Sequence, residues 1–425
     1  MSNLEATSRA HAVALDDADP LADFRSRFVI TDPDLIYLDG NSLGRLPHGV
    51  AARMQRAVEN DWGADLIRGW NKGWWEAPAR IGGMIAALIG ASPGQVMLSD
   101  QTSLNLFKLA AAALKLRPGR SRIVTDTLNF PSDLYVLQGI ARMLGDEHEI
   151  VRIGSRENDI TPDLEALSSA IDERTALVTL SHVTFKSGYM YDMRAVTELV
   201  HRAGALVLWD LSHSVGAVPI HLDACEVDFA TGCTYKYLNG GPGSPAFLYV
   251  NEQLQPEALS PIWGWWGEAH PFTFEMDYQP APGVQRFLTG TAPVLSMIAL
   301  ESALAPMLDA GMERIRQKSI ALTQYAVSLS DARLVPLGFT LGSPRDPERR
   351  GSHISLRHPE GYCINRALIE EMGVIPDFRE PDNLRLGFAP LYVAFQDVWE
   401  GIERLSRVVQ ERRFEKYPRQ RLQVT

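Results

Sequence analysis

The chain has 425 residues, of which 45% are apolar and 22% are charged, and its formal net charge is −11. This composition is typical of an ordinary globular protein, long enough for one large core and a smaller second domain. The acidic balance excludes the basic surface that nucleic-acid binding requires. The three cysteines, Cys225, Cys233 and Cys363, have no CxxC spacing, so neither a disulfide framework nor a metal site is expected. With no apolar run of about 18 residues and no signal-peptide pattern, we expect a cytoplasmic protein without a membrane span.

In chain order, residues 1–20 are polar and alanine-rich, which predicts a flexible arm. Short apolar runs then alternate with helical patterns. The runs cover residues 122–127, 176–183, 205–210, 227–232 and 245–250. Nearly unbroken runs of Val, Leu and Ile are typical of parallel strands buried on both faces. The alternation predicts an α/β fold with a mostly parallel central sheet and crossover helices.

The pattern changes after about residue 291, where two long helical patterns are followed by strands at 353–358 and 383–390. A last helix carries Val398, Ile402, Leu405 and Val409 on one apolar stripe. We therefore predict a large domain over residues 21–305, which includes the N-terminal segment, and a smaller C-terminal α+β domain over residues 306–425.

Polar residues follow two of the predicted strands. Asp210 ends the strand at 205–210, His213 follows it, and Lys236 lies between two tyrosines just after the next strand, before the glycine loop NGGPG. Ligands of an open parallel sheet bind outside the carboxyl ends of its strands. A buried carboxylate holds a protonated ring nitrogen, and a lysine amine condenses with an aldehyde. These are the two groups that pyridoxal phosphate requires from a protein.

The cofactor's phosphate and ring also have candidate partners. Thr102 and Ser103 precede an amphipathic helix, whose start favours an anion. Tyr235 offers a hydroxyl. In NFPSD, residues 129–133, Phe130 offers a ring that stacks on a flat cofactor, and Asp133 offers a carboxylate.

Each motif also has a purely structural interpretation. An Asp followed by His is often a helix cap with a surface polar group, a lysine beside tyrosines often lies on the surface, and a Thr-Ser pair often only caps a helix. A cofactor-free scaffold therefore stays open. GNSLG, residues 40–44, matches the G-x-S-x-G elbow of serine hydrolases. An elbow turns directly into a helix, whereas Arg45, Leu46 and Pro47 follow here, which disfavours that alternative.

With these motifs in place, the chain resembles the kynureninases, which are fold-type I pyridoxal-phosphate enzymes. The resemblance runs from residue 37 to 395 and rests on DGNSLG, NFPSD, DLSHSVGAVP, TYKYLNGGPGSP, WGWWGE and RLGFAPLY. It implies hydrolysis of L-kynurenine to anthranilate and L-alanine in tryptophan catabolism, the kynurenine pathway that also serves NAD biosynthesis. The alternative within the same chemistry is a class V aminotransferase or a cysteine desulfurase. Cys363 is expected inside a helix, which is unlike the mobile-loop cysteine that a desulfurase uses.

The resemblance also implies roles for individual residues. Lys236 is the Schiff-base lysine, Asp210 pairs with the pyridine nitrogen, and Tyr235 contacts phosphate and supplies a proton. The other cofactor contacts implied are Thr102, Ser103, Phe130, Pro131, Ser132, Asp133, Ser181 and His213, with Trp265 and Thr291 from the second subunit of a homodimer. Arg385, Asn41 and Trp70 are implied to contact substrate, Arg385 through its α-carboxylate. Trp70 and Thr291 replace the His and Asn of animal enzymes, which favours kynurenine over 3-hydroxykynurenine.

Overall fold

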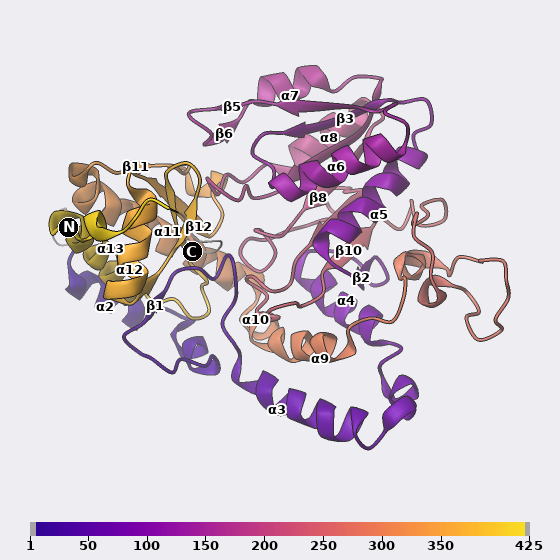
Figure 1. The fold of residues 1–425 in the computed structure, drawn as a ribbon, viewed down its shortest axis with the longest axis horizontal. Coiled ribbons are helices and arrows are strands. Elements are labelled where there is room, and N and C mark those ends of the chain that lie inside the picture. The colour runs from indigo at the N-terminus through magenta and orange to yellow at the C-terminus, as the bar shows by residue number, and fades with distance from the viewer. Residues whose placement is uncertain (1–5, 421–425) are drawn as a thin grey trace.

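The larger part of the molecule is built on a seven-stranded sheet with the order β2-β10-β9-β8-β7-β3-β4 (Figure 1). The protein is described here by a computed structural model covering residues 6–420. The strands are β2 Val96–Leu98, β3 Arg122–Asp126, β4 Glu149–Ile153, β7 Thr175–Ser181, β8 Leu206–Asp210, β9 Phe229–Gly232 and β10 Phe247–Val250. β10 is antiparallel to both of its neighbours, and the other pairs are parallel. The predicted mostly parallel sheet is confirmed.

The central strands form where the sequence is most continuously apolar. Every residue of β7, β8 and β9 is buried, as expected for strands covered on both faces. Sequence patterns did not predict β2, which is only three residues long, or the edge strand β4, where charged residues interrupt the apolar ones. β2 depends on pairing with β10, which is far away in sequence, and β4 depends on pairing with the preceding strand β3.

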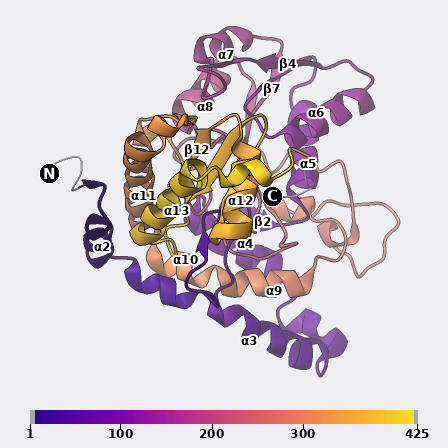
Figure 2. The same ribbon diagram turned by 60° about the vertical axis from the view of Figure 1, so that its left-hand side comes forward.

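Helices cover this sheet. They are α3 His48–Arg56, α4 Ala77–Leu88, α5 Thr102–Lys115, α6 Pro131–Met143, α7 Leu164–Ala170, α8 Met193–Arg202 and α9 Val294–Ala303. α5 packs against β7, β8 and β9, whereas α4 packs against β2. α3 and α9 run side by side below the sheet in both views (Figures 1 and 2). The helix starts of α5 and α6 lie at the carboxyl ends of the strands that precede them.

The C-terminal unit has its own four-stranded antiparallel sheet, with the order β11-β12-β15-β14. Its strands are β11 Thr340–Leu341, β12 His353–Arg357, β14 Asp377–Arg379 and β15 Asn383–Gly387, and its helices are α10 Ala305–Ala310, α11 Met312–Arg333, α12 Gly361–Met372 and α13 Phe395–Gln410. Val398, Ile402 and Leu405 of α13 are buried, as their spacing predicts. The unit is therefore α+β.

The N-terminal segment differs from the predicted arm and packs on the C-terminal unit. Residues Arg9–Asp17 form helix α2, whose first turn is capped by Ser8. Asp16 accepts hydrogen bonds from the first amides of α13, and β1 Ile36–Tyr37 pairs with β13 Val374–Ile375. Figure 2 shows α2 beside α11 and α13. The prediction of a flexible arm is therefore wrong for these residues. Their polar sequence does not predict a helix, and tertiary contacts stabilise it. Residues 1–5 of the predicted arm lie outside the described part of the chain.

The segment between β10 and α9 has only short 3₁₀ turns and extends from the body at the right of Figure 1. It exposes Trp263, Phe272, Phe274 and Met276. Within residues 6–420, no single helix has the length and apolar composition to cross a bilayer, although the bent pair Val294–Ala310 and Met312–Arg333 meets both criteria jointly.

Candidate active site

A cavity of about 210 Å³ opens at the carboxyl ends of β8 and β9. Side chains from three distant parts of the chain line it: Asn41, Ser42, Thr102, Ser103, Phe130, Ser132, Asp133, Phe185, Asp210, Ser212, His213, Tyr235, Lys236, Arg379 and Arg385. Most of the residues predicted from sequence therefore meet at one place. The position agrees with the rule for ligand sites in open α/β sheets.

Lys236 lies in the loop that follows β9, and its Nζ is 2.9 Å from Nε2 of His213. The loop is held from two sides, because Asn239 N donates to the Lys236 carbonyl at 2.9 Å and Gly44 N donates to the Tyr235 carbonyl at 2.8 Å. A Cβ at Gly44 would lie 2.3 Å from the Lys236 carbonyl oxygen, so only glycine fits there. The DGNSLG motif thus supports the lysine loop.

Two buried carboxyls face the same cavity. Ser212 donates to Asp210 Oδ1 from its amide at 2.8 Å and from its hydroxyl at 2.6 Å, whereas no hydrogen-bond partner of Oδ2 is found among residues 6–420. Asp133 Oδ2 is also buried without a partner in the described chain. Burial raises the pKa of both groups, and the charge of Asp210 adds to the effect on the pKa of Asp133. The pair is therefore suited to a cationic ligand atom.

His213 is neutral in this setting. Burial lowers its pKa well below the usual value, and the charge of Lys236 lowers the pKa further. Its Nδ1 is buried without a partner in the described residues, which leaves one ring nitrogen for a ligand.

The starts of α5 and α6 converge on the cavity wall. Ser103, in the first turn of α5, and Ser132, in the first turn of α6, are in contact through their hydroxyls at 3.1 Å. No side chain caps either helix start. α6 begins at Pro131, which has no N–H, so the available amides are those of the first turn of α5 and that of Ser132, and helix N-termini favour anions. Phosphate fits this end of the cavity.

Phe130 is the N-cap residue of α6, and its side chain is 41% exposed. Its ring meets Phe185 edge-on, with 5.3 Å between centroids. Phe185 thus holds the Phe130 ring in a T-shaped pair, and Phe130 lines the cavity, where an aromatic ring can stack on a flat ligand.

Arg385 comes from β15 and is 1% exposed. Its Nη1 donates to the Phe185 carbonyl at 2.5 Å, and its Nη2 pairs with Asp377 and Ser42. With the Asn41 amide oxygen turned toward the guanidinium, that oxygen accepts from Nε at 3.0 Å. Two of the three predicted substrate residues, Arg385 and Asn41, are therefore in contact.

Sequence reasoning missed four residues that line the cavity: Ser42, Phe185, Ser212 and Arg379. A signal existed for Arg379, because Asp377 and Arg379 flank Phe378 and two-residue spacing places them on one face of a strand. Ser212 lies inside the predicted DLSHS motif. Phe185 follows β7 without any motif of its own.

Five predicted site residues do not line the cavity: Pro131, Ser181, Trp70, Trp265 and Thr291. Ser181 donates to Asn129 Oδ1 at 2.5 Å, and that oxygen also accepts from Phe130 N, so Ser181 supports the loop that carries Phe130. Trp70 packs on Trp265 with 5.5 Å between ring centroids, and Thr291 is exposed. The roles predicted for these residues stay predictions.

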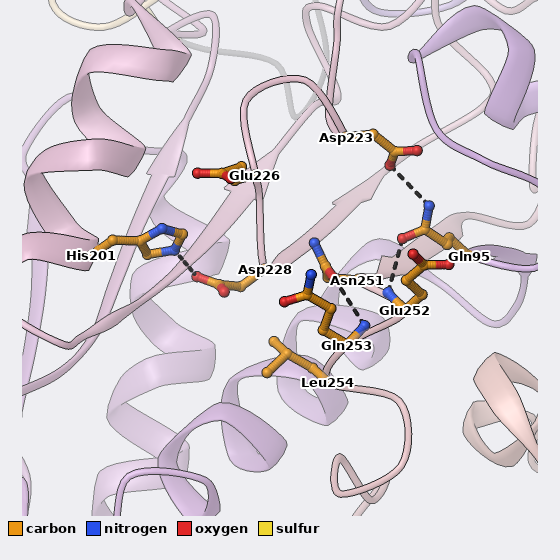
Figure 3. Close-up of a pocket in the computed structure, with 9 residues that line it drawn as sticks. All are labelled: Gln95, His201, Asp223, Glu226, Asp228, Asn251, Glu252, Gln253 and Leu254. Atoms are coloured by element: carbon orange, nitrogen blue, oxygen red, sulfur yellow. Dashed lines mark hydrogen bonds and ion pairs between the residues drawn. The ribbon is translucent and has the colours of Figure 1, made fainter.

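Another cavity, of about 350 Å³, lies beside the start of β9 and the turn after β10, at the opposite edge of the sheet (Figure 3). It contains no lysine, and its aspartates are already engaged. Asp228 contacts His201 Nε2 at 2.8 Å, and Asp223 accepts from Gln95 at 2.9 Å. These contacts make it a structural polar network rather than the active site.

Comparisons with known proteins agree with this geometry. A family model of the kynureninase C-terminal domain matches residues 315–405, and one of the DegT/DnrJ/EryC1/StrS aminotransferases matches residues 87–228. An apo cysteine desulfurase from Thermococcus onnurineus NA1 aligns with a TM-score of 0.77 and 19% identity, over 92% of this chain and 98% of its own. A C-DES variant with glycine linked to its PLP cofactor aligns with a TM-score of 0.74 and 18% identity, over 88% of this chain and 97% of its own.

The fold is that of the fold-type I pyridoxal-phosphate enzymes. A kynureninase from Pseudomonas fluorescens is 45% identical over 408 residues, which cover 95% of this chain and 96% of that protein. The chain belongs to the kynureninase family.

Proposed function

We propose that this chain hydrolyses L-kynurenine to anthranilate and L-alanine, with pyridoxal phosphate held in the cavity, as a step of tryptophan catabolism in the kynurenine pathway. The observation that carries the proposal is the convergence of Lys236, Asp210, Asp133 and two helix starts on one cavity, in a chain of this family.

The residues present fit the cofactor. Lys236 would hold its aldehyde carbon, Asp210 its ring nitrogen and Phe130 its ring face, with the phosphate at Ser103 and Ser132. A protonated ring nitrogen would also stabilise the negative charge of the two buried carboxyls, Asp133 and Asp210. Each of them has an oxygen without a hydrogen-bond partner in the described chain. When bound, the cofactor withdraws electrons from the substrate's α-carbon.

The chain's own residues move the protons. The free Lys236 amine would take the proton from the substrate's Cα, beside the neutral ring of His213. Tyr235 lines the cavity and is suited to donate a proton at Cβ as anthranilate leaves, although the neighbouring Cys233 thiol and burial raise its pKa and make the phenol a weaker acid. Arg385 orients the substrate through its α-carboxylate.

The test is borohydride reduction of the cofactor-loaded protein followed by peptide mass spectrometry. We expect a pyridoxyl group on Lys236, and a Lys236→Ala variant that no longer releases anthranilate from L-kynurenine. Lys115→Ala, at the exposed end of α5, is the matched control and is expected to keep full activity. A turnover-competent Lys236→Ala variant would refute the proposal.

The alternative enzyme classes each require a different residue or give a different product. A desulfurase uses an accessible cysteine near its cofactor, but Cys233 and Cys363 are buried at 2% and 3% exposure, and the partly exposed Cys225 does not line the cavity. An aminotransferase is separated by its products, since it forms a 2-oxo acid and no free anthranilate. For the serine hydrolase, Ser42 contacts Asp377 and Arg385 instead of a histidine, and α3 begins only at His48.

The substrate preference rests on Trp70 and Thr291. We propose that kynurenine is preferred over 3-hydroxykynurenine, because neither residue offers the imidazole or amide that the animal enzymes carry. Comparison of kcat/KM for the two substrates tests this. The double variant Trp70→His with Thr291→Asn is expected to shift the ratio toward the hydroxylated substrate.

A homodimer completes the proposal, with Trp265 and Thr291 reaching the cofactor site of the other subunit. Both lie outside the cavity of their own chain and are solvent-exposed. Trp62, Trp263, Phe272 and Phe274 add exposed aromatic surface, which is typical of an interface. Light scattering should give twice the chain mass, and Phe274→Asp is expected to shift the population toward monomer and reduce activity.

For the compartment we propose the cytoplasm, because all three cysteines are free thiols. Cell fractionation with an antibody against the chain is the measurement.

A further inference from the structure

Four charged side chains form a cluster at the C-terminal sheet, and two of them, Arg379 and Arg385, line the cavity. Asp377 forms ion pairs with both arginines: Oδ2 with Arg385 Nη2, and Oδ1 with Arg379 Nη1, which lies 2.9 Å away. Asp377 and Arg385 are each 1% exposed, whereas the Arg379 side chain is 36% exposed and lines the cavity. The fourth member is Asp39, which comes from the N-terminal segment just after β1 and is close enough for the charge of Asp377 to act on it.

The cluster is close to electrically balanced before any ligand enters, with two carboxyls and two guanidiniums. Every nitrogen of Arg385 already has a partner in Asn41, Phe185, Ser42 or Asp377. A substrate carboxylate is therefore a third negative charge for two positive ones. In a buried site such an excess is costly unless one carboxyl becomes neutral.

Asp39 is held at this position by the main chain. It forms a parallel bridge with Gly387, next to the bond from Gly387 N to the Leu38 carbonyl at 2.7 Å. The amide of Ser42 donates to the Asp39 carbonyl at 2.9 Å, which closes the turn that carries Asn41. Because Gly387 and Arg385 are two residues apart on β15, and Arg385 pairs with Asp377, the Asp39 side chain lies on the same face as Arg385 and Asp377.

Burial, and then the charge of Asp377, raise the pKa of Asp39 to about 7, while Arg385, the Ser42 hydroxyl and Arg379 act in the opposite direction. The other titratable groups facing Asp39 are Tyr37, Tyr237 and Tyr392. Burial raises the pKa of each of these phenols, so they stay neutral. Asp39 is thus a carboxyl of this cluster that can take up a proton near neutral pH.

We propose that Asp39 takes up a proton from solvent when an amino-acid carboxylate enters the cavity, so that Arg379 and Arg385 bind the ligand without an excess negative charge. Asp39 is a positioning residue, which acts through Asp377 and the two guanidiniums. The inference rests on the proposed function only in assuming that the ligand carries an α-carboxylate.

The sign of the pH dependence follows from linkage. Below pH 7 Asp39 is already protonated and binding takes up no proton there. Above pH 7 the free site has lost that proton, while the bound carboxylate keeps the pKa of Asp39 higher, so binding takes up close to one proton. Affinity for the carboxylate therefore falls as pH rises, by at most about tenfold per pH unit from this group.

The experiment is calorimetric titration of the cofactor-loaded protein with L-alanine at pH 8, in two buffers of different ionisation enthalpy. The number of protons taken up is expected to be close to one greater for the wild type than for Asp39→Asn. Asp34→Asn, an exposed aspartate on the same segment, is the control and should match the wild type. Equal proton numbers in the wild type and Asp39→Asn would overturn the inference.

A second variant guards against a folding defect in the first. Asp377→Asn removes one of the two carboxyls, so two guanidiniums then meet only Asp39 and the ligand, and the extra proton uptake should vanish there as well. If it persists, the inference fails. The outcome is separate from that of the proposed function: a protein that takes up the proton but releases no anthranilate from kynurenine keeps this inference and loses the other.

Discussion

At the scale of single residues, the substrate end of the cavity depends on close packing between Asn41 and Gly387. A Cβ at position 387 would lie 1.8 Å from the Asn41 side-chain amide. The same amide supports Nε of Arg385 at 3.0 Å. Because the backbone of Gly387 is not in the left-handed region, the glycine is required for space and not for conformation.

We therefore expect Gly387→Ala to displace Asn41 and weaken its hold on Arg385. Overpacking at such a site costs about 1–3 kcal/mol of stability. Loss of a hydrogen bond to a charged group raises KM for kynurenine roughly tenfold or more. Urea unfolding and steady-state kinetics measure the two effects.

Gly139→Ala is the matched control. Gly139 lies in α6, and a Cβ there meets nothing within 4 Å. This substitution should leave KM unchanged and stabilise the protein slightly, since alanine is the better helix former. An unchanged KM in Gly387→Ala would show that Asn41 does not position the arginine.

The sequence was sufficient to predict those site residues that come together because they follow adjacent strands of the large sheet. Asp210 and Lys236 follow adjacent parallel strands, so their meeting was predictable. Arg379 and Asp377 reach the cavity only through the placement of the C-terminal sheet against the large one, which no local pattern encodes. Ser181 was predicted as a cofactor contact. Its hydroxyl donates to Asn129 Oδ1, which also accepts from Phe130 N, so Ser181 is linked to Phe130 through Asn129.

At the scale of elements, helix N-termini have two roles. Those of α5 and α6 border the cavity, and that of α13 binds the N-terminal helix α2. The start of α13 is satisfied differently, because the carboxylate of Asp16 in α2 accepts from Phe395 N at 2.7 Å and from Gln396 N at 3.0 Å. A residue almost 380 positions away thus supplies the partner that these free amides require.

Asp16→Ala is expected to lower the free energy of unfolding by about 1 kcal/mol, the usual effect of losing a helix cap. The midpoint of urea unfolding measures it, with an unchanged dependence on urea. Asp17→Ala, on the exposed face of α2, should change the stability by less than about 0.5 kcal/mol. Equal effects of the two variants would mean that α2 does not cap α13.

Elements were predicted correctly where buried residues form a continuous apolar run in the sequence. They were missed where an element is stabilised by contacts with distant parts of the chain. The apolar runs at β7, β8 and β9 were predicted because every residue is buried. Helix α2 was missed, since of its nine residues only Ala12 is buried. Its stability comes from contacts with α13 and from a buried ion pair just after it, between Asp19 and Lys318 at 2.6 Å.

At the scale of the whole molecule, the cavity joins three separate parts of the chain. Asn41 comes from the N-terminal segment, Lys236 from the large sheet and Arg385 from the C-terminal unit. A ligand that contacts the lysine loop and the starts of α5 and α6 binds the folded state and has no such site in the unfolded chain. Its binding free energy therefore adds to the stability of the fold.

Removal of pyridoxal phosphate should thus lower the melting temperature, and adding it back should restore it with increasing concentration. At a free cofactor concentration of 100 times Kd the gain is about 2.7 kcal/mol. Pyridoxal, which lacks the phosphate, is the matched control ligand. It should stabilise much less, because the serine hydroxyls and helix starts at Ser103 and Ser132 lose their anion. If pyridoxal stabilises the protein as strongly as the phosphate ester does, these helix starts do not bind the phosphate.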